Sequence, residues 1–265
     1  MFNLKISHTI LDYGWSKQVN NFIYKYYRDV FYNYFRHIHC PSEFIANELE
    51  KHGYSAKLHV ISNGVDKAFR VNKQKKPLEY GNKFIITMVG RFSEEKRQDL
   101  LIEAVKQSKY KNKIQLIFCG KGPKRKELEE KARELPNKTI FGFYTKEKLI
   151  EILDYSDLYV HTSDVEIEAI SCLEAIATGL VPIISDSEKS ATKQFTLDRR
   201  SLFEHGNSVD LANKIDYWIL NENQRKTMEI KYADEVNRKY RISQSIKKIN
   251  DMFNEEIFDC KKIIR

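Results

Sequence analysis

The sequence has few cysteines, and none of them is paired in a metal-binding or disulfide spacing. Cys40, Cys119, Cys172 and Cys260 are scattered over 265 residues, without a CxxC motif. We therefore expect reduced, mostly buried thiols in a cytosolic protein, and neither a zinc site nor a disulfide framework.

Long apolar runs are absent as well. No stretch approaches the roughly 18 consecutive apolar residues of a spanning helix, and residues 1–10 lack a basic-then-apolar signal pattern. Apolar residues make up 42% of the chain and charged residues 31%, which excludes a disordered or collagen-like protein. At roughly 150 residues per domain, the length predicts about two domains.

The net charge of +8 is distributed unevenly, with +11 in residues 67–138 and −8 in residues 139–235. A nucleic-acid binder usually concentrates its basic charge on one element. The basic stretch instead mixes Lys with Glu, as at residues 124–131. This mixture is typical of a solvated helix face, so we expect no nucleic-acid partner.

Aromatic residues crowd the start of the chain, where the first 40 residues hold 11 of the 32. Ser16 is a suitable N-cap for a helix running to about Arg36. Two interpretations remain open for this helix. It is either buried between neighbouring elements, or it presents a basic and aromatic surface to anionic lipid.

Short apolar runs alternate with helical stretches along the rest of the chain, which predicts a parallel sheet with helices on both faces. Ser42 predicts the start and Gly53 the end of one of the helices. The expected strands are 37–40, 57–61, 84–89, 114–118, 139–141, 158–160, 181–184 and 201–203. The expected helices after residue 80 are 95–107, 123–135, 146–155, 169–178, 208–221, 224–237 and 242–258.

In such a sheet, ligands bind beyond the carboxyl ends of the strands, so the loops that follow the strands carry the candidate chemistry. After one strand, Gly90 permits a turn. Arg91 and Lys96 suit a diphosphate, because the planar guanidinium of Arg binds two oxygens at once and the ammonium of Lys acts as a point charge. After the next, Gly120 and Gly122 permit close approach to a ligand. An ordinary tight turn remains the alternative for that second loop.

The third loop, residues 163–175, carries two carboxylates eight positions apart, Glu166 and Glu174. Carboxylates accept hydrogen bonds from vicinal hydroxyls, so the pair fits a ribose at one end and a hexose at the other. The helix that follows offers N-terminal amides to an anion. Helix-capping acids with a surface ion pair are the alternative interpretation.

Four motifs together resemble a known family. In order, they are Asn63-Gly64-Val65-Asp66, Val89-Gly90-Arg91-Phe92 with Glu95-Lys96, Gly120-Lys121-Gly122-Pro123, and Glu166-x7-Glu174 followed by residues 175–182. Over about residues 37–220, the chain resembles the retaining GT-B nucleotide-sugar glycosyltransferases of family 4 (group 1). The resemblance implies an α/β, GT-B-like fold with a complete Rossmann-like C-terminal donor domain and a partial N-terminal α/β domain.

The resemblance also implies roles for single residues. Arg91 and Lys96 would hold the donor diphosphate, Glu174 the ribose, and Glu166 the donor sugar. His8 resembles the first-domain histidine that lines the donor cleft, with a structural histidine as the alternative. Gly90, Gly120 and Gly122 would lie against the substrate.

The phosphate cradle would be completed by backbone amides near Ile170 and Ser171. The family commonly has an aromatic residue or Pro, then Gly, where this chain has Glu168 and Ala169. The Ala169 amide can still donate, but its methyl group narrows the expected sugar pocket and Glu168 adds a charge. The family's Gly-Gly-x-Pro-Glu stretch is replaced by residues 185–190.

We expect three parts: residues 1–66 as a partial N-terminal, acceptor-side domain, 67–235 as the donor-binding domain, and 236–265 as a C-terminal helix that returns to the first domain. We therefore expect the chain to be N-terminally truncated or unusually short.

The expected reaction is transfer of a sugar from a UDP- or GDP-sugar to an acceptor hydroxyl with retention. No DxD motif occurs, and we expect neither metal nor cofactor. The expected acceptor is lipid-linked or a glycan, the location cytoplasmic, and the inner membrane face a candidate surface for peripheral binding. The alternative is a non-catalytic donor-binding half that needs a partner chain.

Overall fold

The computed structural model describes residues 35–263, with side chains up to Phe258. His8 and nearly all of the helix predicted from Ser16 lie outside the described residues. Cys40, Cys119 and Cys172 are buried free thiols, as expected.

A small two-stranded parallel sheet comes first, built from β1 (His37–Cys40) and β2 (Lys57–Val60). The helix α3 (Glu43–Lys51) connects the two strands. Ser42 caps α3 by accepting a hydrogen bond from a backbone amide of its first turn, and Gly53 follows it with a φ of 75°. Both predicted boundaries of this helix are therefore confirmed.

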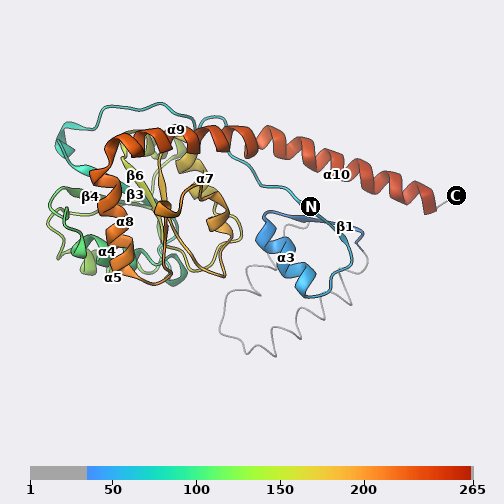
Figure 1. The fold of residues 1–265 in the computed structure, drawn as a ribbon, viewed down its shortest axis with the longest axis horizontal. Coiled ribbons are helices and arrows are strands. Elements are labelled where there is room, and N and C mark those ends of the chain that lie inside the picture. Colours follow the sequence, from blue (N-terminus) through green and yellow to red (C-terminus); the bar gives the residue numbers. More distant parts are fainter. Residues whose placement is uncertain (1–34, 264–265) are drawn as a thin grey trace.

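The large sheet has six parallel strands in the order β5-β4-β3-β6-β7-β8. Its order changes direction between β3 and β6, which are neighbours in space but not in sequence (Figure 1). This is a topological switch point, where the loops at the carboxyl ends of the strands diverge and leave room for a ligand. The strands are β3 (Phe84–Val89), β4 (Ile114–Cys119), β5 (Ile140–Gly142), β6 (Leu158–His161), β7 (Pro182–Ser185) and β8 (Leu202–Phe203).

Helices cover both faces of the large sheet. The helix α4 packs against α5 and α8, while α7 packs against α9. The helices are α4 (Gln98–Gln107), α5 (Arg125–Ala132), α6 (Lys146–Tyr155), α7 (Ile170–Ala177), α8 (Ser208–Leu220), α9 (Glu222–Lys239) and α10 (Ile242–Ile263). Short 3-10 helices span Leu78–Tyr80, Glu94–Lys96, Ala191–Phe195 and Arg199–Ser201.

The prediction of one continuous helix over residues 95–107 is wrong. The chain forms a 3-10 turn at Glu94–Lys96, and α4 begins only after Arg97, whose φ is 51°. Thr162, in the loop after β6, donates to the carbonyls of Lys96 and Arg97, at 2.8 Å each. This contact from a distant loop holds the turn between the 3-10 helix and α4, and it fixes the backbone that carries Lys96.

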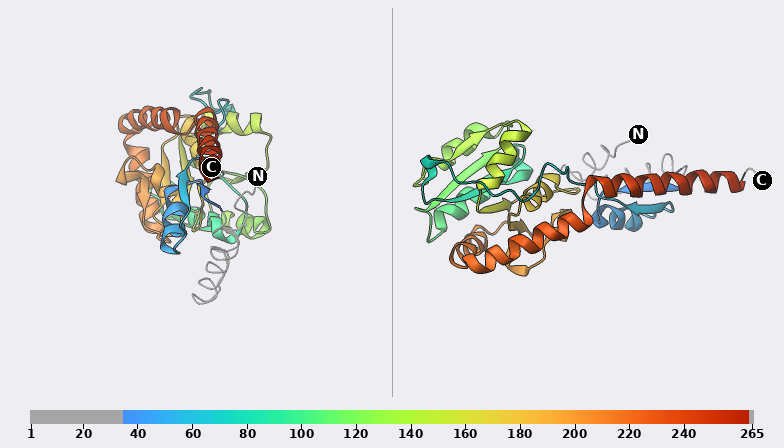
Figure 2. Two further views of the ribbon diagram at one scale, coloured as in Figure 1. Left: turned by 90° about the vertical axis from the view of Figure 1, so that its right-hand side faces the viewer. Right: turned by 90° about the horizontal axis from the view of Figure 1, so that it is seen from above.

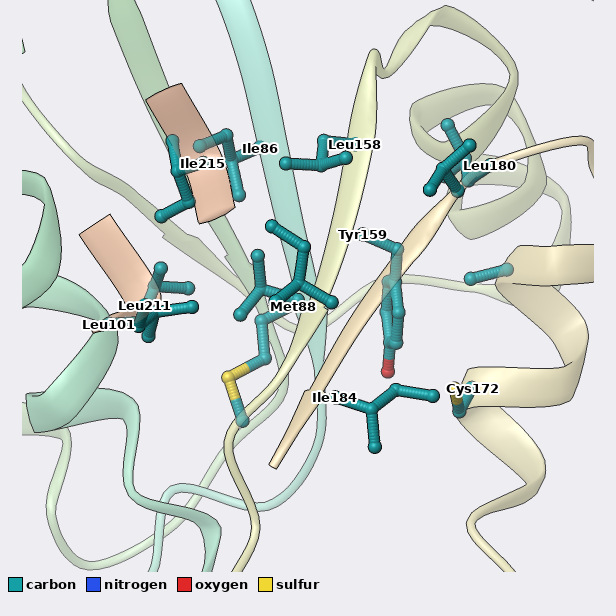
Figure 3. Close-up of a cluster of buried hydrophobic side chains, with 14 of the residues drawn as sticks. Ile86, Met88, Leu101, Leu158, Tyr159, Cys172, Leu180, Ile184, Leu211 and Ile215 are labelled. Carbon is teal, nitrogen blue, oxygen red and sulfur yellow. The ribbon is translucent and has the colours of Figure 1, made fainter. Parts of the chain in front are cut away.

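The core of the large sheet has an apolar layer on each face (Figure 3). Met88 of β3 lies on one face with Leu101 of α4 and Leu211 of α8, and Tyr159 of β6 lies on the opposite face, toward α7. Each of these four side chains is almost fully inaccessible to water. This packing makes the sheet a rigid base for the loops at its carboxyl edge.

The last helix, α10, extends away from the large sheet and runs along the small one (Figures 1 and 2). Its start lies against Gly64, where a Cβ atom would come within 2.7 Å of the Ile242 backbone. With a φ of 79°, this position suits glycine in both conformation and space.

Within residues 35–263, we find no helix with the combined length and apolar character that a membrane crossing requires.

Candidate active site

The loop after β3 carries the predicted cationic residues. Gly90 ends the strand, and Arg91 follows it with an exposed side chain. The Gln98 side chain donates to the Arg91 carbonyl at 2.8 Å, which holds the loop to the start of α4. The stem of Lys96 lies over Gly90, since a Cβ atom there would be 3.8 Å from the Lys96 Cδ. Both cations therefore leave the same edge of the sheet.

The loop after β6 brings the first predicted carboxylate to one of these cations. Lys96 Nζ lies 2.5 Å from Glu166 Oε1, and His161 Nε2 lies 2.9 Å from the same oxygen. The Glu166 side chain is 10% exposed and that of His161 is 2% exposed. Residues 70 positions apart thus form one nearly buried polar cluster at the carboxyl edge.

This cluster keeps Glu166 ionised. Burial alone would raise the pKa of Glu166, but the hydrogen bond and charge of His161, together with the charge of Lys96, outweigh it. The resulting pKa is about 2. Glu166 is therefore an acceptor of hydrogen bonds at neutral pH, which is the form that binds sugar hydroxyls.

His161 and Tyr159 complete the cluster, although the sequence did not single them out. The Tyr159 hydroxyl lies 3.2 Å from His161 Nδ1 and 3.3 Å from Ser171 Oγ. Both are alternate residues of β6, so they share one face of the strand. The period-2 position of His161, one residue beyond the predicted strand end, is the signal that could have identified it.

The helix α7 begins at the same place, with Ala169 as its N-cap in the left-handed region, at φ 61° and ψ 64°. The predicted amides of Ile170 and Ser171 are the first of the helix. Ala169 contributes no side-chain cap, so the first-turn amides retain their capacity to donate to an anion. The family's glycine would adopt this conformation without the strain that alanine carries.

Glu174 lies one turn further along α7, in a different environment from Glu166. Burial raises its pKa to about 7, opposed by the charge of Lys146 and assisted by Asp66. Lys146 and Asp66 pair with each other at 2.8 Å. Glu174 is thus poised between its acid and its carboxylate at neutral pH.

Glu168 does not present a free charge to the site. Its carboxylate accepts hydrogen bonds from the Asn63 backbone at 3.1 Å and from the Asn63 side chain at 2.5 Å. In the same loop, Ser42 donates to the Ile167 carbonyl at 2.6 Å. These bonds join the loop after β6 to the segments around the small sheet.

Residues 185–190, which replace the family's glycine-rich stretch, support the loop that carries Glu166. The Ala191 amide donates to the Glu166 carbonyl at 2.9 Å, and Ser187 donates to the Asp164 carbonyl at 2.5 Å. The backbone of Glu166 is therefore fixed from the neighbouring strand end as well as by its own side chain.

Gly120 and Gly122 have a packing reason to be glycine. A Cβ atom at Gly120 would lie 1.9 Å from the Gly90 carbonyl oxygen, and one at Gly122 would lie 2.3 Å from that of Phe92. Both glycines also line a cavity of about 630 Å³. Close packing therefore accounts for both glycines, and they also lie where a ligand could contact them.

This smaller cavity has a mostly apolar lining at the carboxyl edge of β3 and β4. Besides the glycines it is lined by Arg91, Phe143, Tyr144 and Leu149. Phe143 is 66% exposed, and Lys121 Nζ lies 4.3 Å from its ring centre. An exposed aromatic ring beside a cation offers a stacking surface for a planar ligand.

A larger cavity of about 1190 Å³ lies on the other side of Arg91. Its lining combines both signs of charge, with Lys189 and Arg199 facing the same space as Asp164 and Asp186. Arg91 lines both cavities. A phosphate at Arg91 would therefore join the apolar cavity to the charged one.

The doubly wound parallel sheet, with cations and carboxylates at its switch point, defines an α/β fold of the GT-B glycosyltransferase type. The chain belongs to the glycosyl transferases of group 1, whose family model matches residues 69–235. A second family model, Glycosyltransferase Family 4, matches residues 6–69.

Among curated proteins, a GDP-mannose-dependent alpha-mannosyltransferase from Corynebacterium glutamicum is 32% identical over 151 residues. These residues are 55% of this chain and 34% of that protein. The chain thus spans about a third of the length of the curated relatives that it matches.

Similar solved structures include two of particular interest. The catalytic domain of the cholesterol-alpha-glucosyltransferase from Helicobacter pylori is 49% identical, with a TM-score of 0.55, covering 58% of this chain and 99% of that one. The Anabaena protein Alr3699/HepE, solved in complex with UDP and glucose, is 19% identical with a TM-score of 0.78. It covers 90% of this chain and 67% of that one, and shows the shared fold.

Proposed function

We propose that the chain transfers a sugar, with retention, from a UDP- or GDP-sugar to an acceptor hydroxyl. The observation that carries the proposal is the Lys96–Glu166–His161 cluster beside the first amides of α7. It places a cation, a carboxylate fixed in its ionised form and helix amides at the switch point of the sheet. A nucleotide-sugar needs these three kinds of group at its diphosphate and its sugar hydroxyls.

In this proposal, residues 67–235 bind the donor, and its diphosphate lies between Arg91, Lys96 and the amides of Ile170 and Ser171. As the sugar leaves, negative charge grows on the diphosphate. Preorganised cations and helix amides stabilise that charge in a partly water-excluded site. These residues would supply the stabilisation without a cofactor.

Lys96 changes partner when the donor binds. Its ammonium lies 2.5 Å from Glu166, so a phosphate would compete with that carboxylate. His161 would stay bonded to Glu166, which it contacts at 2.9 Å, and a sugar hydroxyl would take the place of Lys96. Lys96 would then contact the diphosphate and Glu166 the sugar.

The nucleoside fits the apolar cavity. The base would lie near Gly120 and Phe143, and Glu174 would accept from the ribose hydroxyls. A pKa of about 7 for Glu174 means that the ribose binds best to its carboxylate form. Donor affinity would therefore rise with pH between roughly 6 and 8, as Glu174 ionises.

The acceptor is proposed from the relatives. One of the similar proteins is named as a cholesterol-alpha-glucosyltransferase, so we propose glucose as the transferred sugar and a sterol or glycolipid hydroxyl as the acceptor. Such an acceptor would bring the protein to the cytoplasmic face of a membrane.

Calorimetric titration with UDP, GDP and UDP-glucose tests the donor site. Arg91→Ala and Glu174→Ala should each weaken binding by roughly tenfold or more, because each removes a hydrogen bond to a charged group. Lys131→Ala, which removes an exposed lysine of α5 that pairs with Glu127, is the matched control and should bind normally. Unchanged affinity in both site variants would contradict the assignment.

Transfer is tested separately with labelled UDP-glucose and sterol-containing vesicles. Labelled glycolipid formed by the chain alone supports the proposed reaction. Tight donor binding without transfer, restored by adding a second protein, would instead identify a donor-binding half that needs a partner chain.

A further inference from the structure

A cluster of imidazoles and carboxylates lies on the small sheet, well away from the candidate active site. Within the part of the chain that the structure describes, His37, His59 and Glu255 bring three ligand atoms within 4.8 Å of one another. They come from β1, β2 and α10, so the cluster forms only when α10 lies along the small sheet (Figure 2). The residues are 22 and 196 positions apart.

The distances suit a small tetrahedral ion. His37 Nδ1 and His59 Nε2 are 2.8 Å apart, and Glu255 Oε2 lies 4.0 and 3.9 Å from them. Around a zinc ion, with ligand distances of about 2.0–2.2 Å, ligand atoms are separated by roughly 3.3 Å. Changes of about 0.5 to 0.7 Å in these three separations would therefore bring the ligand atoms to tetrahedral spacing.

The other nitrogen of His37 lies beside a second carboxylate. His37 Nε2 is 3.3 Å from Glu256 Oε2. A carboxylate that accepts the proton of this nitrogen would leave the Nδ1 lone pair to bind a metal. The proton between the two rings then belongs to His59 Nε2.

The side chains of His37 and His59 are 5% and 13% exposed, whereas that of Glu255 is 47% exposed. The site is thus closed by the sheet on one side and reachable by ions from the other.

We propose that His37, His59 and Glu255 bind one divalent transition-metal ion of the zinc type, which fastens α10 to the small sheet. On binding, the proton on His59 Nε2 moves to its Nδ1, and both facing nitrogens donate their lone pairs to the ion. Two imidazoles and a carboxylate suit zinc better than Mg²⁺, which prefers oxygen ligands. The fourth position is open to water.

Lys57 supplies a competing cation. Its Nζ lies 2.5 Å from Glu255 Oε2, so the ammonium neutralises the carboxylate in the absence of an ion and must move aside for one. Replacing Lys57 with methionine should therefore tighten metal binding, whereas it would have no such effect on ions held elsewhere.

The test is titration of the full chain, stripped with chelator, with Zn²⁺ and separately with Mg²⁺. We expect one Zn²⁺ per chain and no Mg²⁺. His37→Gln and His59→Gln should abolish that binding, and Glu256→Gln should weaken it roughly 10- to 100-fold. His52→Gln, a histidine outside the cluster, is the control and should bind normally.

Substitution with Co²⁺ provides a readout on the wild-type protein that does not depend on variants folding. A tetrahedral nitrogen and oxygen ligand set gives intense visible absorption, and Lys57→Met should reach it at lower Co²⁺ concentration. Zinc binding unaffected by both histidine variants, or a weak octahedral cobalt spectrum, would overturn the proposal.

Discussion

The two sheets of this molecule are held together by different physics. The six-stranded sheet has a continuous apolar core on both of its faces. Within residues 35–263, the small sheet has a core of six buried residues under α3, and its other face meets α10 through histidines, Lys57 and two glutamates. An apolar core depends on little besides packing, whereas a polar contact depends on pH, salt and ions.

This difference decides which sheet can support a fixed binding site and which can support contacts that change partner. The large sheet fixes the backbone of the loops at its edge, so a charged cluster such as Lys96 and Glu166 is held by a rigid base. Among the described residues, the small sheet has the smaller apolar core, and α10 is joined to it by side chains that can change partner. We expect the donor site to survive conditions that release α10.

The largest effect should follow from breaking the charged cluster on the rigid side. Lys96→Met leaves Glu166 nearly buried with His161 as its remaining ionic partner. Losing one member of a buried ion pair should lower the free energy of unfolding by about 3 kcal/mol. Urea unfolding measures it, with Lys148→Met as the control for an exposed lysine of an i,i+3 pair. If the free energy of unfolding falls equally in the two variants, the Lys96–Glu166–His161 cluster does not contribute specially to stability.

Removing core volume from each sheet tests their independence. Leu101→Ala opens a cavity beneath the large sheet and should cost about 3 kcal/mol, and Leu49→Ala should cost about 2 kcal/mol in the small one. Hydrogen exchange then shows where protection is lost. We expect Leu101→Ala to lower protection in both sheets and Leu49→Ala only in β1, α3 and β2. If Leu49→Ala lowers protection throughout both sheets, the two sheets unfold as a single cooperative unit.

The two carboxylates of α7 and its preceding loop should give opposite pH dependences. The folded pKa of Glu166 is about 2, below its ordinary 4.5, so its stabilising contribution is present above pH 4.5 and lost as pH falls towards 2. The folded pKa of Glu174 is about 7, so the folded state binds the extra proton and stability falls as pH rises from 4.5 to 7.

Unfolding followed across pH separates these contributions. Glu174→Gln should remove the fall between pH 4.5 and 7, and Glu166→Gln should remove the loss below pH 4.5. Glu134→Gln, at a 73% exposed side chain, is the control and should leave the profile unchanged. A profile that Glu174→Gln does not alter would show that Glu174 titrates normally.

Most of the fold could be predicted, because period and composition are local. The strands at residues 37–40 and 84–89 and the helix at 146–155 have the predicted bounds. The helix predicted over 95–107 is interrupted at Arg97, whose φ is 51° and whose carbonyl accepts from the Thr162 hydroxyl. A contact 65 residues away leaves no local signal.

The same distinction applies to the candidate site. Motifs selected Arg91, Lys96 and Glu166 because residue type and position after a strand are visible in sequence. Tertiary packing supplied the role of His161, and it supplied the cluster of His37, His59 and Glu255 as well. Their partners are brought together only by the register of β1 with β2 and by the path of α10.

At Ala169 the backbone conformation that the fold requires is one that alanine disfavours. This position gives the smallest of the expected effects on stability. Alanine here adopts a φ of 61°, which costs an L-residue roughly 1 kcal/mol. Glycine would avoid this cost, but it also makes the unfolded chain more flexible, which offsets part of the stabilisation. Ala169→Gly should therefore raise stability by at most about 1 kcal/mol. Ala212→Gly within α8 should lower it by about 1 kcal/mol, because glycine weakens helix interiors. If urea unfolding shows a higher free energy of unfolding for Ala169→Gly and a lower one for Ala212→Gly, the first turn of α7 is held under strain. If both variants are less stable, the methyl group of Ala169 contributes favourable packing.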